Sequence, residues 1–162
     1  MKVTISQVFP TRVALVDAFL SDEINSMLID EIIQWKNSDT GVNKSNFGKA
    51  WHSPTTLMQR KTRGCLQFSQ SLFEVLEALF NQLLDETVIR EHKLSIAAWA
   101  NVLSGNGMNR IHVHPGSVWS CVYYLTEISS SANSQDGCLI LEDFTCRSMV
   151  DSKFLSKEGL ES

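Results

Sequence analysis

The hydrophobic pattern of the first 36 residues changes period once. Apolar side chains cluster over 3–20, where Pro10 divides them, and this predicts two short strands joined by a turn. Ser21 then precedes Asp22 and Glu23, an acidic first turn that a helix dipole favours. The apolar residues that follow recur at helical spacing: Ile24, Met27, Leu28, Ile32 and Trp35. We expect a helix over residues 22–36.

Residues 37–64 are polar, rich in turn residues and basic. No acidic residue occurs between Asp39 and Glu74, whereas five cations lie in that interval: Lys44, Lys49, Arg60, Lys61 and Arg63. Two interpretations stay open. The segment is either a solvated loop that happens to be basic, or a loop that overhangs a site for an anionic substrate.

A second helix is predicted over residues 70–85. Ser71 and Glu74 have the spacing of a capping box. The apolar face that follows is too wide for a helix exposed to water on one side: Leu72, Phe73, Val75, Leu76, Leu79, Phe80, Leu83 and Leu84. We expect this helix to pack across the open face of a sheet.

From residue 93 onward the pattern is that of short strands separated by turns. Apolar segments occur at 94–103, 111–114, 118–125 and 138–141, with Gly-Asn-Gly at 105–107 and a polar connection at 129–137. Such strands favour an antiparallel sandwich or barrel with the two helices packed outside it. The predicted fold class is therefore α+β, as one domain over 1–162.

Composition narrows the class of protein further. Of the 162 residues 43% are hydrophobic and 20% are charged, so the chain is globular, and the formal charge of −4 argues against generic nucleic-acid binding. The four cysteines form no C-x-x-C pair and are expected to be reduced. With no apolar run of signal-peptide or membrane-span length, we expect a soluble, cytoplasmic protein with no membrane partner.

The stretch His112-Val113-His114-Pro115 is the most informative for chemistry. In a strand, residues two apart point to the same face, about 6.6–6.8 Å apart along the backbone. Both imidazoles would then converge on one side, where their rings could lean together and hold a metal ion with bonds of about 2 Å. Because Pro115 stops the strand, the pair would lie at the mouth of a barrel.

Neighbouring strands supply candidate partners for such a site. Asn101 could donate its amide to a bound carboxylate, and alternation would turn one of Tyr123 and Tyr124 inward. Each also has an ordinary interpretation, a turn-capping Asn and aromatic residues that fill a sheet.

Taken together these residues resemble a family. The pattern Trp99-x-Asn101, Asn109-x-x-His112-x-His114-Pro115 and Tyr123-Tyr124 is similar to that of small 2-oxoglutarate/Fe(II)-dependent oxygenases of bacteria and phages, and 46–53 resembles the family's G-W-x-S stretch. The resemblance implies a double-stranded β-helix (jelly roll) that holds Fe(II), with 2-oxoglutarate as cosubstrate. It implies a dioxygenase that couples decarboxylation of 2-oxoglutarate to hydroxylation of an unidentified substrate, for which the basic loop favours an anion.

Carried over residue by residue, the resemblance makes His112 the first metal ligand and His114 the second. Asn101, Tyr123 and Tyr124 would lie along the cosubstrate pocket. Two positions depart from the family: His114 stands where the wider superfamily has a carboxylate, and Cys121 replaces a glycine.

The end of the sequence departs further. No histidine follows His114, and the only arginine after Arg110 is Arg147, so the distal His and the cosubstrate Arg of the superfamily are missing. The residues after Arg147 show no strand pattern. We therefore expect an incomplete barrel that lacks its closing strands, with an exposed sheet edge through which copies could associate.

Other interpretations remain. A cupin also carries H-x-H, but its acidic ligand is absent because 115–126 contain no Asp or Glu. A zinc site that uses Cys138 and Cys146 lacks paired spacing. The main rival is a truncated, non-catalytic jelly-roll domain that binds a partner or ligand.

Overall fold

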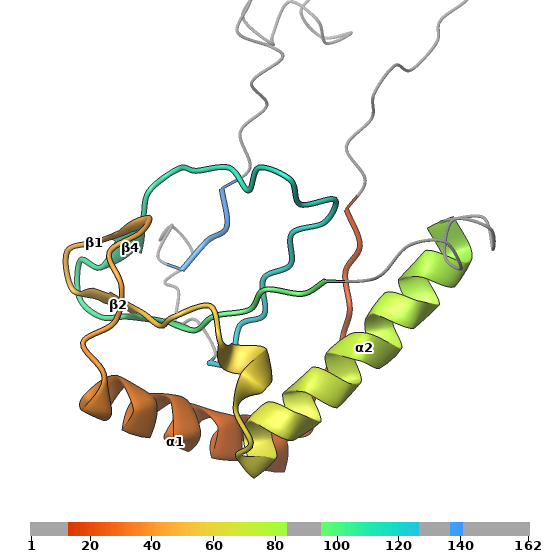
Figure 1. Cartoon of the computed structure of the whole chain (residues 1–162), viewed down its shortest axis with the longest axis horizontal. Helices are drawn as coiled ribbons and strands as arrows, with labels where there is room; N and C mark the ends of the chain where they lie inside the picture. Colours follow the sequence, from red (N-terminus) through yellow and green to blue (C-terminus); the bar gives the residue numbers. More distant parts are fainter. Residues whose placement is uncertain (1–12, 84–94, 127–136, 141–162) are drawn as a thin grey trace, which may run out of the picture. The chain divides into compact units, whose positions relative to one another are not determined.

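The structure is a computed structural model that describes residues 13–83, 95–126 and 137–140. The chain consists of two compact units, Met1–Leu125 and Thr126–Ser162. Most of the second unit lies outside the described residues, so one domain over 1–162 stays a prediction. The elements of the first unit are α1 (Asp22–Ser38), β1 (Asn46–Phe47), β2 (Ala50–His52), the 3-10 turn η1 (Leu57–Gln59), α2 (Arg63–Leu83), β3 (Asn101–Leu103) and β4 (Met108–Asn109) (Figure 1).

Helix α1 confirms the first helix prediction to within two residues of its end. The Oγ of Ser21 accepts a hydrogen bond from the backbone N–H of Ile24 at 3.4 Å, so the predicted cap is present. The side chains at Leu28, Ile32 and Trp35 form its buried stripe. These three residues belong to the apolar positions from which the sequence predicted the helix.

Helix α2 begins seven residues before the predicted start, at Arg63, and the predicted capping box at Ser71 and Glu74 is wrong. Its real cap comes from α1. The carboxylate of Glu31 accepts hydrogen bonds from the N–H of Gly64 at 2.9 Å, the N–H of Cys65 at 3.0 Å and the hydroxyl of Thr62 at 2.6 Å. These donors satisfy the otherwise unpaired start of the helix, and Ser71 lies in its interior.

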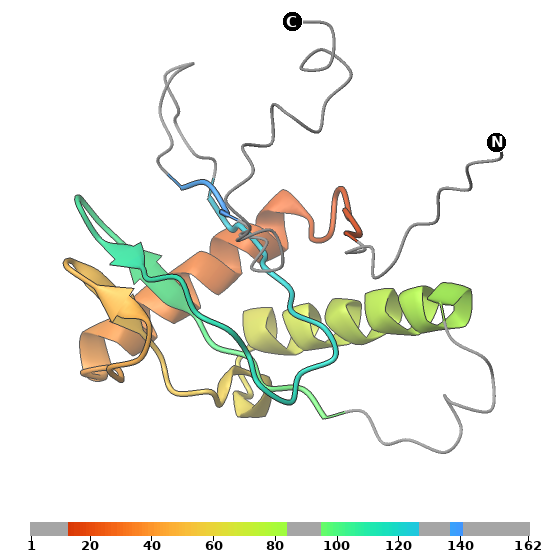
Figure 2. The same ribbon diagram turned by 90° about the horizontal axis from the view of Figure 1, so that it is seen from above.

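Helices α1 and α2 pack against each other (Figure 2), and Gly64 lies at their contact. A Cβ atom added at Gly64 would lie 3.0 Å from the backbone of Leu28 and 2.7 Å from the Glu31 carboxylate. Any larger residue at this position would therefore push α2 away from α1.

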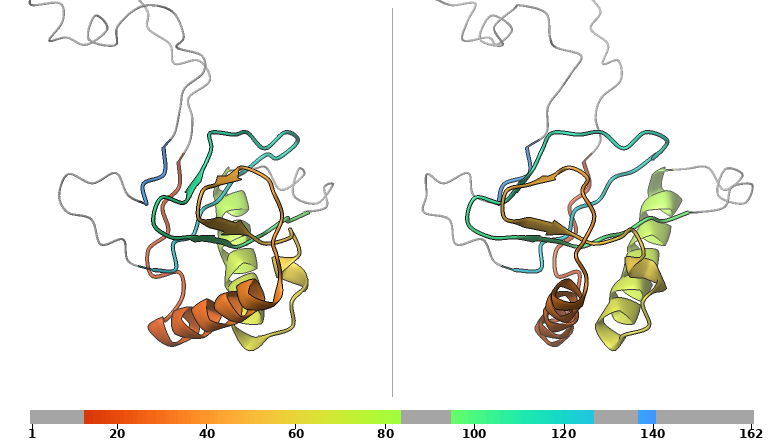
Figure 3. Two further views of the ribbon diagram at one scale, coloured as in Figure 1. Left: turned by 90° about the vertical axis from the view of Figure 1, so that its left-hand side faces the viewer. Right: turned by 60° about the vertical axis from the view of Figure 1, so that its left-hand side comes forward.

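The strands form one irregular antiparallel ribbon in which residues 45–53 run beside 100–110 (Figure 3). Strand β1 pairs with β4, and β2 pairs with β3 in a register that places His52 opposite Asn101. Between the pairs the ribbon is tight, since a Cβ atom on Gly107 would lie 2.4 Å from the carbonyl oxygen of Lys49. Only glycine fits at this crossing.

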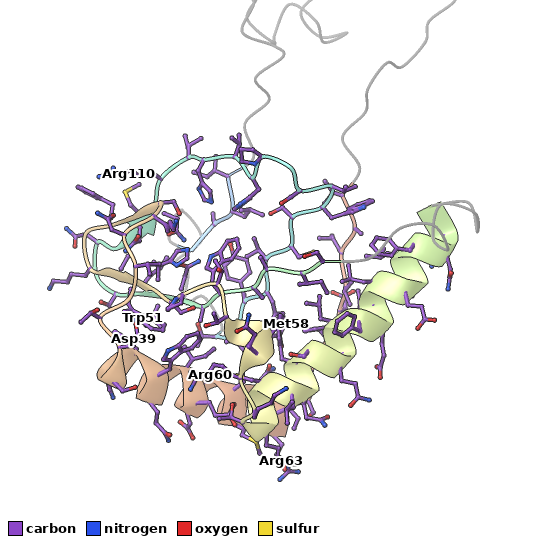
Figure 4. The ribbon with its side chains drawn as sticks, viewed as in Figure 1. Asp39, Trp51, Met58, Arg60, Arg63 and Arg110 are labelled. Carbon is purple, nitrogen blue, oxygen red and sulfur yellow. The ribbon has the colours of Figure 1, made fainter. Side chains whose placement is uncertain are left out.

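A buried core joins the ribbon to the helices. Its buried residues are Leu28, Ile32, Trp35, Trp51, Leu57, Cys65 and Ala100. The rings of Trp35 and Trp51 meet edge to face at 5.6 Å, and the indole N–H of Trp51 donates to the carbonyl of Asp39 just after α1 (Figure 4). The core therefore fixes β2 against the C-terminal end of α1.

The α+β class is confirmed: two helices accompany small antiparallel strand pairs. Several strand predictions are wrong in detail. Residues 13–20, 111–126 and 137–140 contain no regular strand, because their backbones have no neighbouring chain in ladder register among the described residues. The predicted segments at 3–12, 129–136 and 141 lie outside the described residues. No helix in the described ranges is long and apolar enough to cross a membrane.

Candidate metal and ligand site

The predicted histidine pair lies just beyond β4. The N–H of Arg110 donates to the carbonyl of Ser45 at 2.8 Å, which extends the β1–β4 ribbon by one residue pair. The chain then leaves the ribbon as an irregular segment. His112 in this segment is exposed, and His114 is half-buried.

The two imidazoles converge, as the sequence predicted, although they do not lie in a regular strand. Their ring centroids are 4.8 Å apart and the ring planes stand at 84°. The Nδ1 atom of His112 lies 2.6 Å from the carbonyl oxygen of Arg110. Because a carbonyl can only accept, Nδ1 carries the proton, so in the neutral form of the ring the lone pair is on Nε2. Metal-binding histidines are commonly oriented by this kind of hydrogen bond.

A third imidazole lies close to the pair. The centroid of the Trp99 ring is 5.4 Å from that of His114, and the same ring stacks on His52 at 5.4 Å and 12°. The pairing of β2 with β3 places His52 opposite Asn101 and so brings it close to Trp99, although 46 residues of sequence separate the two rings. The sequence offered one signal for it, the resemblance of 46–53 to the G-W-x-S stretch, but no role was predicted.

His52 is held in its neutral form. The residue is only 4% exposed, and burial is the main cause that lowers the pKa of its imidazole. The carbonyl of Ser53, 2.6 Å from Nδ1, acts in the opposite direction, and repulsion from Lys44 and from His112 when it is protonated lowers the pKa further. A lowered pKa means that protonation favours the unfolded chain, so stability decreases as the pH falls through about 6.5, the ordinary value.

These side chains surround a pocket of about 470 Å³, a size suited to a small molecule. Three kinds of residue line it: the histidines, two cations and several apolar or small polar side chains. They are His52, His112, His114, Lys44, Arg110, Trp99, Ile111, Val113, Ser45 and Thr55. A second hollow of about 450 Å³ contains no metal-ligating side chain and is lined by Thr56, Gln59, Arg60, Lys61 and Thr62.

The structure does not bring the predicted cosubstrate residues to this pocket. Asn101 is exposed on β3, and Tyr124 is 47% exposed. The hydroxyl of Tyr123 donates to Oδ1 of Asn25 in α1 at 2.5 Å, and its ring packs on Phe19 at 4.7 Å. Their role toward 2-oxoglutarate therefore stays a prediction.

The residues present fit part of a metal site. Two converging imidazoles, one with its Nε2 lone pair available, suit a divalent first-row metal such as Fe(II). Over 13–83, 95–126 and 137–140 no group of three or more His, Cys, Asp or Glu side chains is placed to hold an ion. The pair therefore accounts for two ligands, and no third ligand is assigned.

Comparison with known proteins agrees with this chemistry. Residues 97–154 match a family described as "Putative 2OG-Fe(II) oxygenase". This segment resembles the 2-oxoglutarate/Fe(II) oxygenases. No curated protein and no solved structure matches the chain.

The match confirms the oxygenase resemblance that the sequence motif indicated. It spans the histidine pair, Trp99 and the three predicted cosubstrate residues. His52 and Lys44 lie outside the matched segment and reach the pocket only through the fold. The oxygenase-like segment therefore forms one wall of the pocket, and the β1–β2 region forms the other.

Proposed function

We propose that the protein is a 2-oxoglutarate- and Fe(II)-dependent dioxygenase that hydroxylates a small substrate. One observation carries the proposal: within the oxygenase-like segment, His112 and His114 converge at 4.8 Å beside a pocket of about 470 Å³. A ferrous ion bound there would allow dioxygen to be activated while 2-oxoglutarate is decarboxylated to succinate.

The residues around the pair position it for this task. His112 and His114 would hold the iron, and the Arg110 carbonyl orients the His112 ring and favours the tautomer in which Nε2 carries the lone pair. Trp99 packs against His114 and restricts its ring. Asn101, Tyr123 and Tyr124 remain proposed cosubstrate residues on the strength of the resemblance alone. For the same reason we propose a jelly-roll core, whose unpaired strand edges could join two copies of the chain.

The test measures metal binding and turnover separately. Protein reconstituted with Fe(II) without oxygen and then desalted should retain about one iron per chain, measured by elemental analysis. With oxygen and 2-oxoglutarate it should release succinate, at least slowly, without added substrate. His112→Ala should lower iron affinity at least about tenfold, since even the loss of an outer-shell partner costs that much.

Val113→Ala is the matched control, because it shortens the side chain between the two histidines and removes no metal-binding atom. It should retain iron as the unchanged protein does. If His112→Ala and Val113→Ala bind iron equally, the metal site is assigned wrongly. If iron binds at His112 but no succinate forms, the non-catalytic binding domain is the correct interpretation.

A further inference from the structure

We infer that the pocket beside His112 and His114 binds the acid group of a small organic anion, held between Lys44 and Arg110. That this anion is the substrate rests on the function proposed above. The binding itself concerns only residues of the described pocket and does not require a metal.

Strand pairing brings the backbones of the two cations close together beside the pocket. Asn46 pairs with Asn109 in the β1–β4 register, and the next pair is Ser45 with Arg110, joined by a backbone hydrogen bond of 2.8 Å. Lys44 precedes Ser45 and lines the same pocket. Figure 4 shows Arg110 at the end of the ribbon where β1 and β4 pair, away from α2.

Both cations are available for a ligand. Neither side chain forms an ion pair with a carboxylate in the described part of the chain, and no Asp or Glu lines the pocket. By contrast, the guanidinium of Arg63 lies 3.8 Å from the carboxylate of Glu23. Of the five cations in the basic loop, only Lys44 lines this pocket, and Arg110 from outside that loop supplies the second charge.

Arg110 is also held in place before any ligand arrives. Its guanidinium carbon lies 4.7 Å from the centre of the Phe47 ring, a cation–π arrangement that leaves the N–H edges free to donate. A guanidinium and an ammonium from residues that line one pocket suit a carboxylate or a phosphate.

The rest of the pocket indicates an organic molecule. Trp99 and the apolar side chains of Ile111 and Val113 line it together with the cations. Because the whole chain carries a net charge of −4, a long polyanion such as nucleic acid would be repelled outside this pocket. The lining therefore favours a small molecule with one acid group and an apolar body.

The experiment uses the full chain freed of metal by a chelator, so that iron plays no part. Benzoate and phenyl phosphate are titrated by ligand-observed NMR, and benzamide serves as an uncharged probe of the same shape as benzoate. At least one acid should bind at least about tenfold more tightly than benzamide. Which acid binds better identifies the carboxylate or the phosphate as the preferred group. Equal binding of benzoate, phenyl phosphate and benzamide would overturn the proposal.

Variants assign the binding to the two cations. Lys44→Gln and Arg110→Gln should each weaken binding of the preferred acid about tenfold and leave benzamide unchanged. Lys49→Gln is the matched control, since Lys49 is an exposed cation of the same ribbon that does not line the pocket. Wild-type affinity in both pocket variants would refute the assignment. Circular dichroism of each variant confirms that it is folded.

Two further measurements distinguish acid binding from the proposed dioxygenase function. His112→Ala should lose iron but, without metal, still bind the preferred acid more tightly than benzamide, whereas Lys44→Gln and Arg110→Gln should weaken acid binding and keep iron. Displacement of the bound acid by 2-oxoglutarate would assign the cations to the cosubstrate and overturn a substrate role. Simultaneous binding of both would support that role.

Discussion

The helical region and the segment that carries the histidine pair differ sharply in burial. In α1 and α2, Leu28 and Cys65 are 1% and 0% exposed. Beyond β4, Ile111, Val113 and Val118 are 62%, 66% and 88% exposed. The helices therefore hold the fold together, and the candidate site lies on a segment that contributes little apolar burial.

The hydrogen bonds show the same difference. A helix satisfies its own backbone groups, whereas over 111–126 one backbone hydrogen bond occurs among the described residues, from Ser117 N–H to the His114 carbonyl at 3.1 Å. We therefore expect that residues of the candidate site can be substituted without unfolding the helical region. Substitutions that unfold the helical region, in contrast, should also destroy the site.

The largest effect is expected in the helical core. Leu28→Ala should lower the free energy of unfolding by about 2–5 kcal/mol, because it leaves a cavity between α1 and its neighbours. Urea unfolding followed by far-UV circular dichroism measures the change. Val118→Ala, at a side chain 88% exposed, is the control and should change stability by less than about 0.5 kcal/mol. Similar losses in both variants would mean that the two regions do not differ as described.

A smaller effect is expected where α1 caps α2. Burial acts to raise the pKa of Glu31, but the hydrogen bonds from Thr62, Gly64 and Cys65 outweigh it and hold the pKa below its ordinary value of 4.5. Glu31→Ala should therefore cost about 1–2 kcal/mol near neutral pH, since these donors lose their acceptor. Urea unfolding at several pH values measures the loss.

The stability lost in Glu31→Ala should depend on pH. A lowered folded pKa means that the contribution of Glu31 is complete above pH 4.5 and is lost as the pH falls below that value. The difference between the unchanged protein and Glu31→Ala should therefore shrink in acid. Asp30→Ala, at the exposed neighbouring position in α1, should show no such difference. A constant difference across this pH range would contradict the capping role.

The two helices show how far sequence reasoning extends to the fold. The start of α1 was predictable because its cap, Ser21, is three residues from the N–H that it accepts. The start of α2 was not, because Glu31 caps it from 34 residues away at Cys65. Ser71 and Glu74 have the correct spacing for a local cap, but the contact with α1 decides the boundary.

The candidate site divides in the same way. The convergence of His112 and His114 was predictable from their spacing, although the reason given, a regular strand, is wrong. His52 was not assigned to the site, and Lys44 was only one of five cations in a loop that could overhang it, because strand pairs 49 and 63 residues apart bring these residues to the pocket. Spacing identifies chemistry within one segment, and only the fold shows what completes the pocket.

The smallest expected effect concerns the hydrogen bond that joins the two regions. Tyr123 donates to Asn25 of α1, so Tyr123→Phe should lower the free energy of unfolding by about 0.5–1.5 kcal/mol. The ring contact with Phe19 remains in this variant, and the loss is therefore that of the hydroxyl alone. Denaturant unfolding measures the change, with Asn25→Ala as the partner deletion.

A double-mutant cycle with Asn25→Ala decides between two roles of the same hydroxyl. If Tyr123 anchors the segment to α1, the two losses of stability are not additive, and affinity for 2-oxoglutarate is the same in Tyr123→Phe as in the unchanged protein. If Tyr123 binds the cosubstrate, as the family resemblance implies, affinity for 2-oxoglutarate falls in Tyr123→Phe. Because Asn25 lies on α1 and does not line the pocket, Asn25→Ala should lower stability without reproducing that loss of affinity.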